Sequence, residues 1–379
     1  MHLFFQQLIN GLSLGAIYAL IAVGYTMVYG VLRLINFAHG DVYMFGAMMG
    51  VYLLAGDFST YGAIVAHPLF AVPTALLGIA ILIALSILKY KGISSPPWLA
   101  WIGKVVAAVA LSVLTMEIAG RLIHWIGLPS WISFAITMLA AMIVCGALGF
   151  VIELMAYRPL RNRPRIAVLI TAIGVSMFLE YGGQAIFGAT PKTFPHVVPI
   201  AATQTHVAGE IAPNFVIHGI TIGYIDVMII VITLALMVVL RWIVMGTRTG
   251  MALRAVSFRF DTASLMGINI DRIVSITFVL GSMLAAAAGV LIAARTPKVD
   301  PLMGLMPGIK AFVAAVLGGI GNIPGAVAGG FVLGLVEVLV QAYIPMGSQY
   351  KDAIAFIILI AILLVKPTGL FGRTLVEKV

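Results

Sequence analysis

Four glutamates lie in or near long apolar stretches, where an ionisable side chain is unfavourable and is therefore a candidate for function. They are Glu117, Glu153, Glu180 and Glu337. Arg121 follows Glu117 by one helical turn, so the two side chains can pair. Glu153 lies beside Arg158 near the predicted edge of a membrane span. Glu180 and Glu337 are therefore the better candidates for charged groups inside a bundle of helices.

A polar break separates the first two apolar stretches, where Asn36, His39, Gly40 and Asp41 follow one another closely. Three polar side chains between apolar helices are unfavourable unless they meet water or each other. Two placements remain open. The side chains of Asn36, His39 and Asp41 line a transport pathway inside the membrane, or they lie at the membrane boundary.

A second break is the glycine-rich run Gly318-Gly-Ile-Gly-Asn-Ile-Pro-Gly325. It follows an apolar segment instead of a strand, and its spacing does not fit a dinucleotide-binding fingerprint. Glycine and proline break a helix and free backbone groups, which membrane proteins tolerate beside other protein or a water-filled cavity. Such breaks mark transport pathways, and we name Gly319, Gly321 and Pro324 as candidates. A tight turn at the membrane surface is the alternative.

No pattern indicates a nucleotide, a metal or another cofactor. Gly103-Lys104 is followed by Val105 and lacks the phosphate-binding loop pattern. The histidines between residues 188 and 222 have no metal-ligand spacing, and a single cysteine, Cys145, excludes disulfides within the chain. We therefore expect the isolated chain neither to bind nor to hydrolyse ATP.

The composition places these residues in a membrane protein. Hydrophobic residues make up 62% of the 379 residues and charged residues only 9%. The mean hydropathy is +1.14. A soluble domain carries about a quarter charged residues. The net charge of +9 does not indicate nucleic acid, because the basic residues lie in short turns between apolar runs.

A transmembrane helix needs about 20 residues to cross a hydrocarbon core of about 30 Å. The apolar runs predict eleven segments near 8–31, 37–55, 66–89, 100–125, 130–156, 166–187, 223–244, 273–294, 308–320, 325–344 and 351–366. The segment 308–320 is too short to cross alone. We expect an all-α integral membrane protein: a polytopic helical bundle of about 10–11 membrane segments with broken or short helices, in one domain spanning 1–379.

Positive charge predicts the orientation, because cytoplasmic turns are rich in Lys and Arg. With the N-terminus outside and the C-terminus inside, most of the 22 basic residues fall in inside turns. The outside set is Arg121, Lys192, Arg295, Lys298, Lys310 and Lys351. This orientation makes 188–222 a periplasmic segment and 245–272 a cytoplasmic one.

The segment 245–272 carries six charged residues between two apolar spans, so it lies in water. Small and apolar residues such as Ala255, Val256 and Leu265 are interspersed among the charges. The pattern predicts one or two short helices under the membrane that offer a face to a partner. A solvated loop is the alternative.

Several stretches of the chain together resemble one family, the LivH-type permease subunit of branched-chain amino acid ABC importers. The resemblance rests on Gln7–Gly30, Ile35–Met44, Ala156–Arg161, Leu265–Arg272, Lys310–Ala326 and the tail Pro367–Val379. It covers the chain except for about 57–130, where one extra pair of spans is predicted.

The resemblance implies that 245–272 is the coupling loop that contacts a cytoplasmic ATPase. The residues assigned to that contact are Arg254, Ala255, Leu265, Met266, Gly267 and Ile268. It also implies four partner chains: a second homologous permease subunit, two ATPase subunits and a periplasmic substrate-binding protein. The protein itself would be a transport subunit of the bacterial inner membrane without an ATPase site.

Two other functions remain open at this stage. A secondary transporter would couple protons or sodium to an intramembrane carboxylate such as Glu180 or Glu337. Relatives in the family that the chain resembles also handle urea or short amides, so the substrate is not determined by this chain. A channel would need a constriction ring that no part of the sequence specifies.

Overall fold

The computed structural model describes residues 2–55, 97–126, 128–161, 163–195, 214–217, 220–366 and 368–372. Within these ranges, eight helices are long and apolar enough to cross a membrane. They are α1 (His2–Leu32), α5 (Pro97–Ile126), α6 (Ser130–Ile152), α7 (Arg165–Phe187), α8 (Tyr224–Gly246), α11 (Ile270–Arg295), α13 (Ile323–Tyr343) and α14 (Gly347–Val365). The predicted all-α, multi-pass membrane bundle is confirmed.

Two further apolar helices are shorter. α2 covers Ala38–Ala55 and α12 covers Leu305–Gly318. The 14 residues of α12 span only about 21 Å at 1.5 Å per residue, as predicted for a segment too short to cross alone. The short and broken helices expected in the bundle are therefore present.

Only part of the predicted insertion at 57–130 lies among the described residues. Its second span, expected at 100–125, corresponds to α5. Its first span, expected at 66–89, lies outside the described residues. The extra pair of spans stays a prediction.

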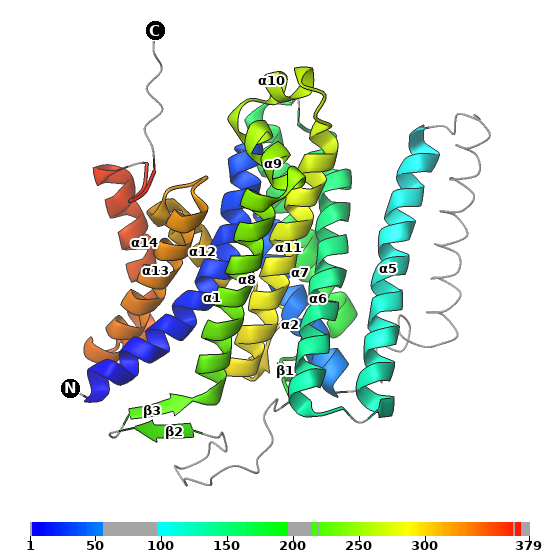
Figure 1. Cartoon of the computed structure of the whole chain (residues 1–379). Helices are drawn as coiled ribbons and strands as arrows, with labels where there is room; N and C mark the ends of the chain where they lie inside the picture. Colours follow the sequence, from blue (N-terminus) through cyan, green and yellow to red (C-terminus); the bar gives the residue numbers. More distant parts are fainter. Residues whose placement is uncertain are drawn as a thin grey trace.

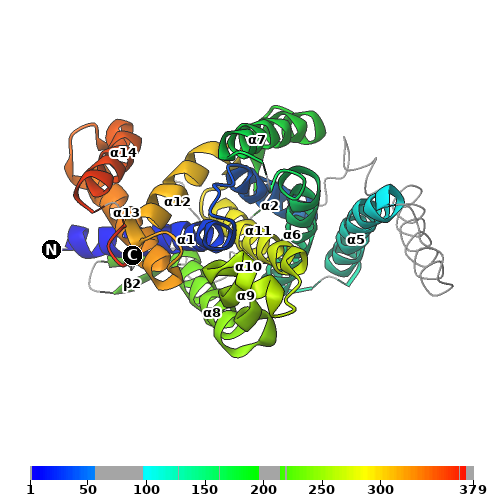
Figure 2. The same ribbon diagram turned by 90° about the horizontal axis from the view of Figure 1, so that it is seen from above.

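Close packing of α1, α2, α11 and α13 forms the centre of the bundle, and α5 and α14 lie at opposite edges (Figures 1 and 2). Small residues permit this packing. A Cβ on Gly46 would lie 2.5 Å from the Cα of Ala286, and one on Gly330 would lie 2.5 Å from the Cα of Ala19. Backbones that approach so closely gain dispersion contacts, which drive helix association in a membrane. Small residues at these positions therefore allow the central helices to approach closely.

The two ends of the bundle differ in their connections (Figure 1). One end carries α9 (Arg248–Phe258) and α10 (Phe260–Leu265), and we call it the α9–α10 end. At the opposite end, β1 (Lys192–Thr193) pairs antiparallel with β4 (Lys298–Val299). The strands β2 (Asn214–Ile217) and β3 (Ile220–Gly223) form a hairpin there. Its β-branched residues favour strands, so the described parts of 188–222 include sheet as well as coil.

Candidate functional site

The α9–α10 segment is a pair of docked helices that begins with a tight reversal after α8. The hydroxyl of Thr247 accepts a hydrogen bond from the backbone N–H of Gly250 at 3.1 Å and caps α9. A Cβ on Gly250 would collide with the backbone of Ile243 and Val244, so only glycine allows this reversal. Leu253 and Val256 are buried and fix α9 to the bundle. The prediction of short helices is confirmed, and the solvated loop is wrong.

The outer end of this segment is an apolar tip held by a glycine turn. The backbone N–H groups of Gly267 and Ile268 donate to the carbonyls of Ser264 and Ala263, which is a Schellman cap. The φ of Gly267 is +79°, a left-handed conformation that disfavours side chains. Directly before it, Leu265 and Met266 are 86% and 78% exposed. Large apolar side chains that are presented in this way mark an interaction site.

Of the six residues predicted for the partner contact, not all are exposed on the surface of the protein. Arg254 and Ala255 are exposed on α9, as are Leu265, Met266 and Gly267 after α10. Ile268 is half-buried and packs against the hydrophobic core. Ile268 therefore anchors the turn, and the other residues form the accessible surface.

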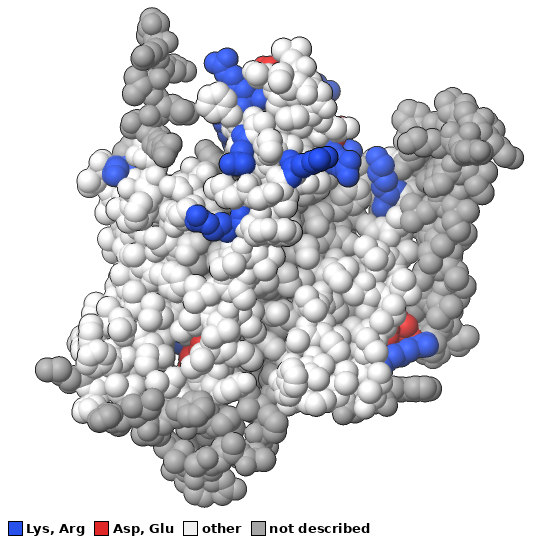
Figure 3. Space-filling view, in the orientation of Figure 1, with Lys and Arg blue, Asp and Glu red and all other residues white. Residues whose placement is uncertain are grey.

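Basic side chains gather on the same end of the molecule. In Figure 3, Lys and Arg on the visible face cluster over the α9–α10 end, whereas few appear over the middle of the bundle. In the described part of the chain, neither Arg33 nor Arg254 forms an ion pair. The α9–α10 end therefore presents positive charge to whatever it meets.

A cleft of about 620 Å³ opens beside α9. Its walls come from the end of α1, the end of α8, α9 and the turn between α12 and α13. Arg254 lines one side, and Gly321 and Pro324 line another. Residues that were predicted separately for ATPase contact and for the pathway thus border a single cavity.

Several groups of the turn between α12 and α13 are hydrogen-bonded to protein. Gly319 and Gly321 have φ values of +102° and +90°. Asn322 caps α13 and also donates from its amide to the carbonyl of Phe371 at 3.0 Å. The backbone N–H of Leu370 donates to Leu317 at 2.8 Å. The tight turn is confirmed, and it also borders the cleft. A role in a pathway stays a prediction.

The polar break between α1 and α2 lies inside the bundle. Asn36 accepts a hydrogen bond from the hydroxyl of Tyr157 at 2.8 Å. The Nε2 atom of His39 lies 3.2 Å from the carbonyl oxygen of Ile21, in the middle of α1. Asp41 accepts from the hydroxyl of Ser176 at 2.5 Å. All three polar side chains are buried against protein groups, and both their placement along a pathway and their placement at the membrane boundary stay predictions.

The start of α2 meets the start of α12. A Cβ on Gly40 would lie 2.5 Å from the carbonyl oxygen of Gly304 and 3.0 Å from the Cα of Gly308. The rings of Tyr25 and His39 pack edge to face with centroids 4.6 Å apart. The two interrupted helices therefore touch each other through glycines in the interior of the protein.

Glu337 belongs to a buried ionic network that we call the Lys310 network. Lys310 Nζ lies 2.8 Å from Glu337 Oε1 and 2.6 Å from Asp352 Oδ1. The hydroxyl of Tyr18 donates to Glu337 Oε2 at 2.8 Å. The prediction that Lys310 lies in an outside turn is wrong, because its side chain is buried inside the bundle. Glu337 is therefore a paired carboxylate that links α1, α12 and α13.

Glu180 is the one predicted carboxylate without a hydrogen bond or ion pair to any other residue in the described ranges. It is half-buried on α7, one turn after Ser176. Glu117, by contrast, forms the predicted pair with Arg121 at 2.6 Å. No group of three or more His, Cys, Asp or Glu in the described ranges could hold a metal ion.

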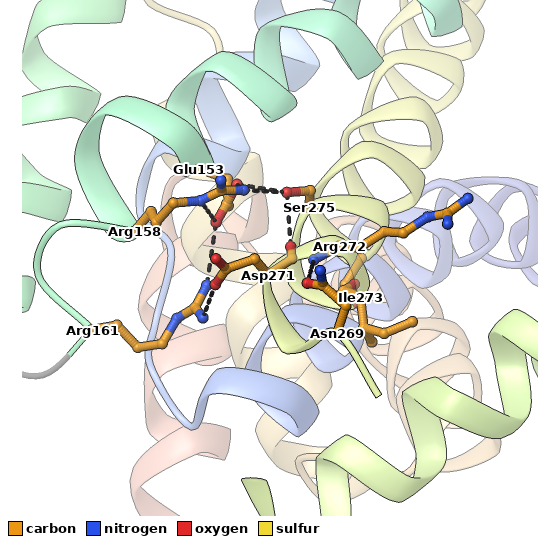
Figure 4. Close-up of polar contacts among 9 residues, drawn as sticks. Glu153, Arg158, Arg161, Asn269, Asp271, Arg272, Ile273 and Ser275 are labelled. Carbon is orange, nitrogen blue, oxygen red and sulfur yellow. Dashed lines mark hydrogen bonds and ion pairs between the residues drawn. The ribbon is translucent and has the colours of Figure 1, made fainter. Parts of the chain in front are cut away.

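Glu153, which sequence reasoning placed at a span edge, is completely buried at the α9–α10 end. Figure 4 shows it beside Arg158 and Ser275, with Asp271 and the guanidinium of Arg161 below it. The nearby Arg158 is the one sign in the sequence that Glu153 is paired. Its contacts on α11 come from residues more than one hundred positions away and have no local signal. We call Glu153, Arg158, Arg161, Asp271 and Ser275 the Glu153 network.

Comparison with known proteins places these features in a family. A model of the family described as "Branched-chain amino acid transport system / permease component" matches residues 7–121 and 99–363. The chain is 37% identical over 376 residues to the high-affinity branched-chain amino acid transport system permease protein BraD of Pseudomonas aeruginosa. That alignment covers 99% of this chain and 98% of the relative.

Two further relatives carry related descriptions. The permease protein LivH of Escherichia coli is 36% identical over 376 residues, again with 99% and 98% of the two chains covered. A probable LivH of Methanocaldococcus jannaschii is 27% identical over 241 residues, which cover 62% of this chain and 73% of the relative. No solved structure matches the chain.

Proposed function

The chain belongs to the family of permease components of branched-chain amino acid transport systems, and on that premise we propose how it works with its partners. It is the membrane-spanning permease of an ABC importer that moves branched-chain or related hydrophobic amino acids. Two separate ATPase subunits bind and hydrolyse ATP, and a periplasmic binding protein delivers the substrate. A second, homologous permease subunit completes the pathway. The observation that carries this proposal is the similarity over nearly the whole length of both chains.

The α9–α10 end faces the cytoplasm in this proposal, and the protein lies in a bacterial inner membrane. The gathering of Lys and Arg at that end supports the orientation, because positive residues are retained on the cytoplasmic side (Figure 3). The N-terminus and the hairpin of β2 and β3 then face the periplasm, and the C-terminus faces the cytoplasm.

The α9–α10 segment is the proposed contact with the ATPases. The tip of Leu265 and Met266 can enter an apolar groove, and Arg254 offers a charge for an acidic residue at its rim. A stiff base is needed to transmit force, and the Thr247 cap and the buried Leu253 support such a base. The cleft beside Arg254 places this contact next to the proposed exit of the pathway at Gly321 and Pro324.

The break at Asn36, His39 and Asp41 lies beside this pathway in the proposal, although its side chains bond to protein groups. Their hydrogen bonds to Tyr157, Ile21 and Ser176 support a role in holding the interrupted helices together. Glu180 remains the candidate that faces the pathway directly, because it lacks a partner in the described part of the chain.

Reconstitution of the complete complex tests the proposal. Proteoliposomes that contain both permeases and the ATPases, supplied with the cognate binding protein, should accumulate leucine, isoleucine or valine only when ATP is present. Uptake driven by a proton or sodium gradient without the ATPases would overturn the proposal. Uptake of urea or a short amide in preference to these amino acids would overturn the substrate assignment alone.

Variants of the tip test the ATPase contact. Gly267→Trp combined with Arg254→Glu should reduce co-purification of the ATPases at least tenfold while membrane insertion is retained. Arg121→Glu is the matched control, because it reverses an exposed charge far from the tip. If the double variant instead leaves co-purification, ligand-stimulated hydrolysis and uptake unchanged, the α9–α10 segment is only a linker.

A further inference from the structure

We infer that the Glu153 network transmits displacement of the α9–α10 segment into the bundle, with the Arg161–Asp271 ion pair as its positioning contact. The inference rests on the proposed function and adds residues that the predicted ATPase contact does not include. Arg161 lies in the connection between α6 and α7, whereas Asp271 lies on the first turn of α11 (Figure 4).

A buried carboxylate forms the centre of the network. Glu153 accepts hydrogen bonds from Arg158 Nε at 3.1 Å and Nη2 at 2.8 Å. Arg161 Nη2 approaches the same carboxylate at 3.3 Å. Ser275 donates to it at 2.8 Å. Two cations and a hydroxyl therefore satisfy one anion that has no access to water.

A π-helical turn, η1 (Glu153–Tyr157), brings Arg158 back over Glu153. The backbone N–H of Arg158 donates to the carbonyl of Glu153 at 2.8 Å, an i→i+5 bond. In a regular α-helix, residues five positions apart do not face each other, because neighbours are three or four apart. The widened turn stacks the two residues, and π-turns of this kind occur frequently at functional sites.

The network crosses from η1 to α11 at the point where the α9–α10 segment ends. Asn269 caps α11 by accepting from the backbone N–H of Arg272 at 3.1 Å. Asp271 and Ser275 occupy the next two turns, and Arg161 Nη1 reaches Asp271 Oδ1 at 2.6 Å. In the described ranges, Ser275 adds two more polar links from α11 to this region, because its hydroxyl accepts from Arg158 Nη2 at 2.7 Å and donates to Glu153 at 2.8 Å. We expect a shift of the tip at Leu265 and Met266 to move Asp271, because only three residues separate Asp271 from the Schellman turn at Gly267.

The two halves of the network differ in strength. Glu153 is fully buried and is unfavourable to expose, whereas its partners Arg158 and Arg161 are half-buried. The Asp271 side chain is 55% exposed, so water screens its pair with Arg161 and the pair is weak. Arg161 can therefore release Asp271 and remain beside Glu153. The pair can reform at each cycle without unfolding its surroundings.

Helix α11 continues this link through the protein. It packs against α1, α2 and α6 along its length and ends at Arg295. The strand β4 follows directly and pairs with β1, which follows α7. Movement at Asp271 is thus conveyed toward the opposite end of the bundle and toward the strand that leads out of α7.

The test measures substrate imported per ATP hydrolysed by the complete complex in proteoliposomes. Arg161→Gln and Asp271→Asn should each lower this ratio about tenfold. If the two residues act through each other, the double variant should lower it no further than either single variant. Arg161→Lys keeps the charge and should recover part of the loss. Arg163→Gln is the matched control, since Arg163 is an exposed arginine in the same connection without a side-chain partner in the described ranges.

Several outcomes separate transmission from folding and from docking. Additive losses in the double variant, or an equal loss in Arg163→Gln, would overturn the inference. Loss of ATPase co-purification in Asp271→Asn would also overturn it, because the pair would then serve docking. If Arg161→Gln fails to insert, Asp271→Asn decides the question, because its side chain is exposed. A wild-type complex without ATP-dependent uptake would refute the proposed function instead.

Discussion

The Glu153 network and the Lys310 network reverse each other's composition. In the first, one carboxylate is shared by the two arginines Arg158 and Arg161. In the second, one ammonium is shared by Glu337 and Asp352. The first joins a helix connection to the start of α11 at one end of the bundle. The second joins α12, α13 and α14 inside it, with Tyr18 of α1 attached.

This difference indicates that the two networks serve different purposes. Loss of one arginine leaves Glu153 with another cation, so the Glu153 network tolerates rearrangement. Loss of Lys310 leaves Glu337 and Asp352 without an ion-pair partner in the described ranges, so the Lys310 network does not tolerate rearrangement. The short helix α12 has few turns with which to hold itself in the membrane, and Lys310 fixes it to two neighbours. One network suits movement, and the other suits a fixed position.

The largest effect is expected for Lys310→Met. Removal of the only cation should lower the free energy of unfolding by about 3–5 kcal/mol, the usual penalty for breaking a buried ion pair. Chemical denaturation in mixed detergent micelles measures this change. The triple variant Lys310→Met, Glu337→Gln and Asp352→Asn removes the unpaired charges and should recover most of the stability. A triple variant as unstable as the single one would show that Lys310 acts through packing alone.

The Lys310 network also marks a limit of prediction from sequence. The apolar runs located the membrane helices well, because each span must hide its backbone and fill about 20 residues. Lys310 looked like a residue of a turn because it lies near the start of a short apolar run. Its partners Glu337 and Asp352 belong to later helices, and no local pattern reports that pairing. The pairing follows only from the three-dimensional packing of α12, α13 and α14.

The candidate site was predictable to a similar degree. Gly267 and the apolar pair before it have a local signature, a glycine that ends a short helix, and the structure has a Schellman cap there. The depth of His39 had no such signature, because it depends on how far the chain returns beside α1 after Leu32. The sequence places Arg158 near Glu153, whereas Ser275 and Asp271 reach this region from a distant part of the chain.

A smaller effect is expected for Arg158→Gln. Glu153 would lose its two hydrogen bonds to Arg158 but keep Arg161 and Ser275, so the free energy of unfolding should fall by about 2 kcal/mol. The same denaturation experiment measures it. Arg158→Lys keeps the charge without the planar fork and should lie between wild type and Arg158→Gln. A loss as large as that of Lys310→Met would remove the proposed difference between the networks.

Tyr18→Phe sharpens the comparison within the Lys310 network. The substitution removes one hydrogen bond to Glu337 Oε2 and leaves the ion pair with Lys310 in place. The expected loss is about 1–2 kcal/mol, which is typical of a hydrogen bond to a charged group. Tyr29→Phe is the matched control, because the hydroxyl of Tyr29 makes no hydrogen bond in the described ranges. Equal losses in both variants would indicate a general effect of hydroxyl removal.

The smallest effect is expected for Arg121→Gln, which separates distance from burial. Arg121 and Glu117 lie 2.6 Å apart, the same separation as Lys310 and Asp352. The Arg121 side chain is 60% exposed, however, whereas that of Lys310 is 7% exposed. Solvent screens the outer pair and side-chain entropy opposes it, so its loss should lower the free energy of unfolding by no more than about 0.5 kcal/mol.

The change should shrink further as salt is added, because exposed charges are screened within a Debye length. The Lys310→Met effect should depend less on salt, since Lys310 and Glu337 are buried inside the bundle. If the two variants instead respond alike in size and in salt dependence, the separation of the charged atoms determines their contribution and burial does not.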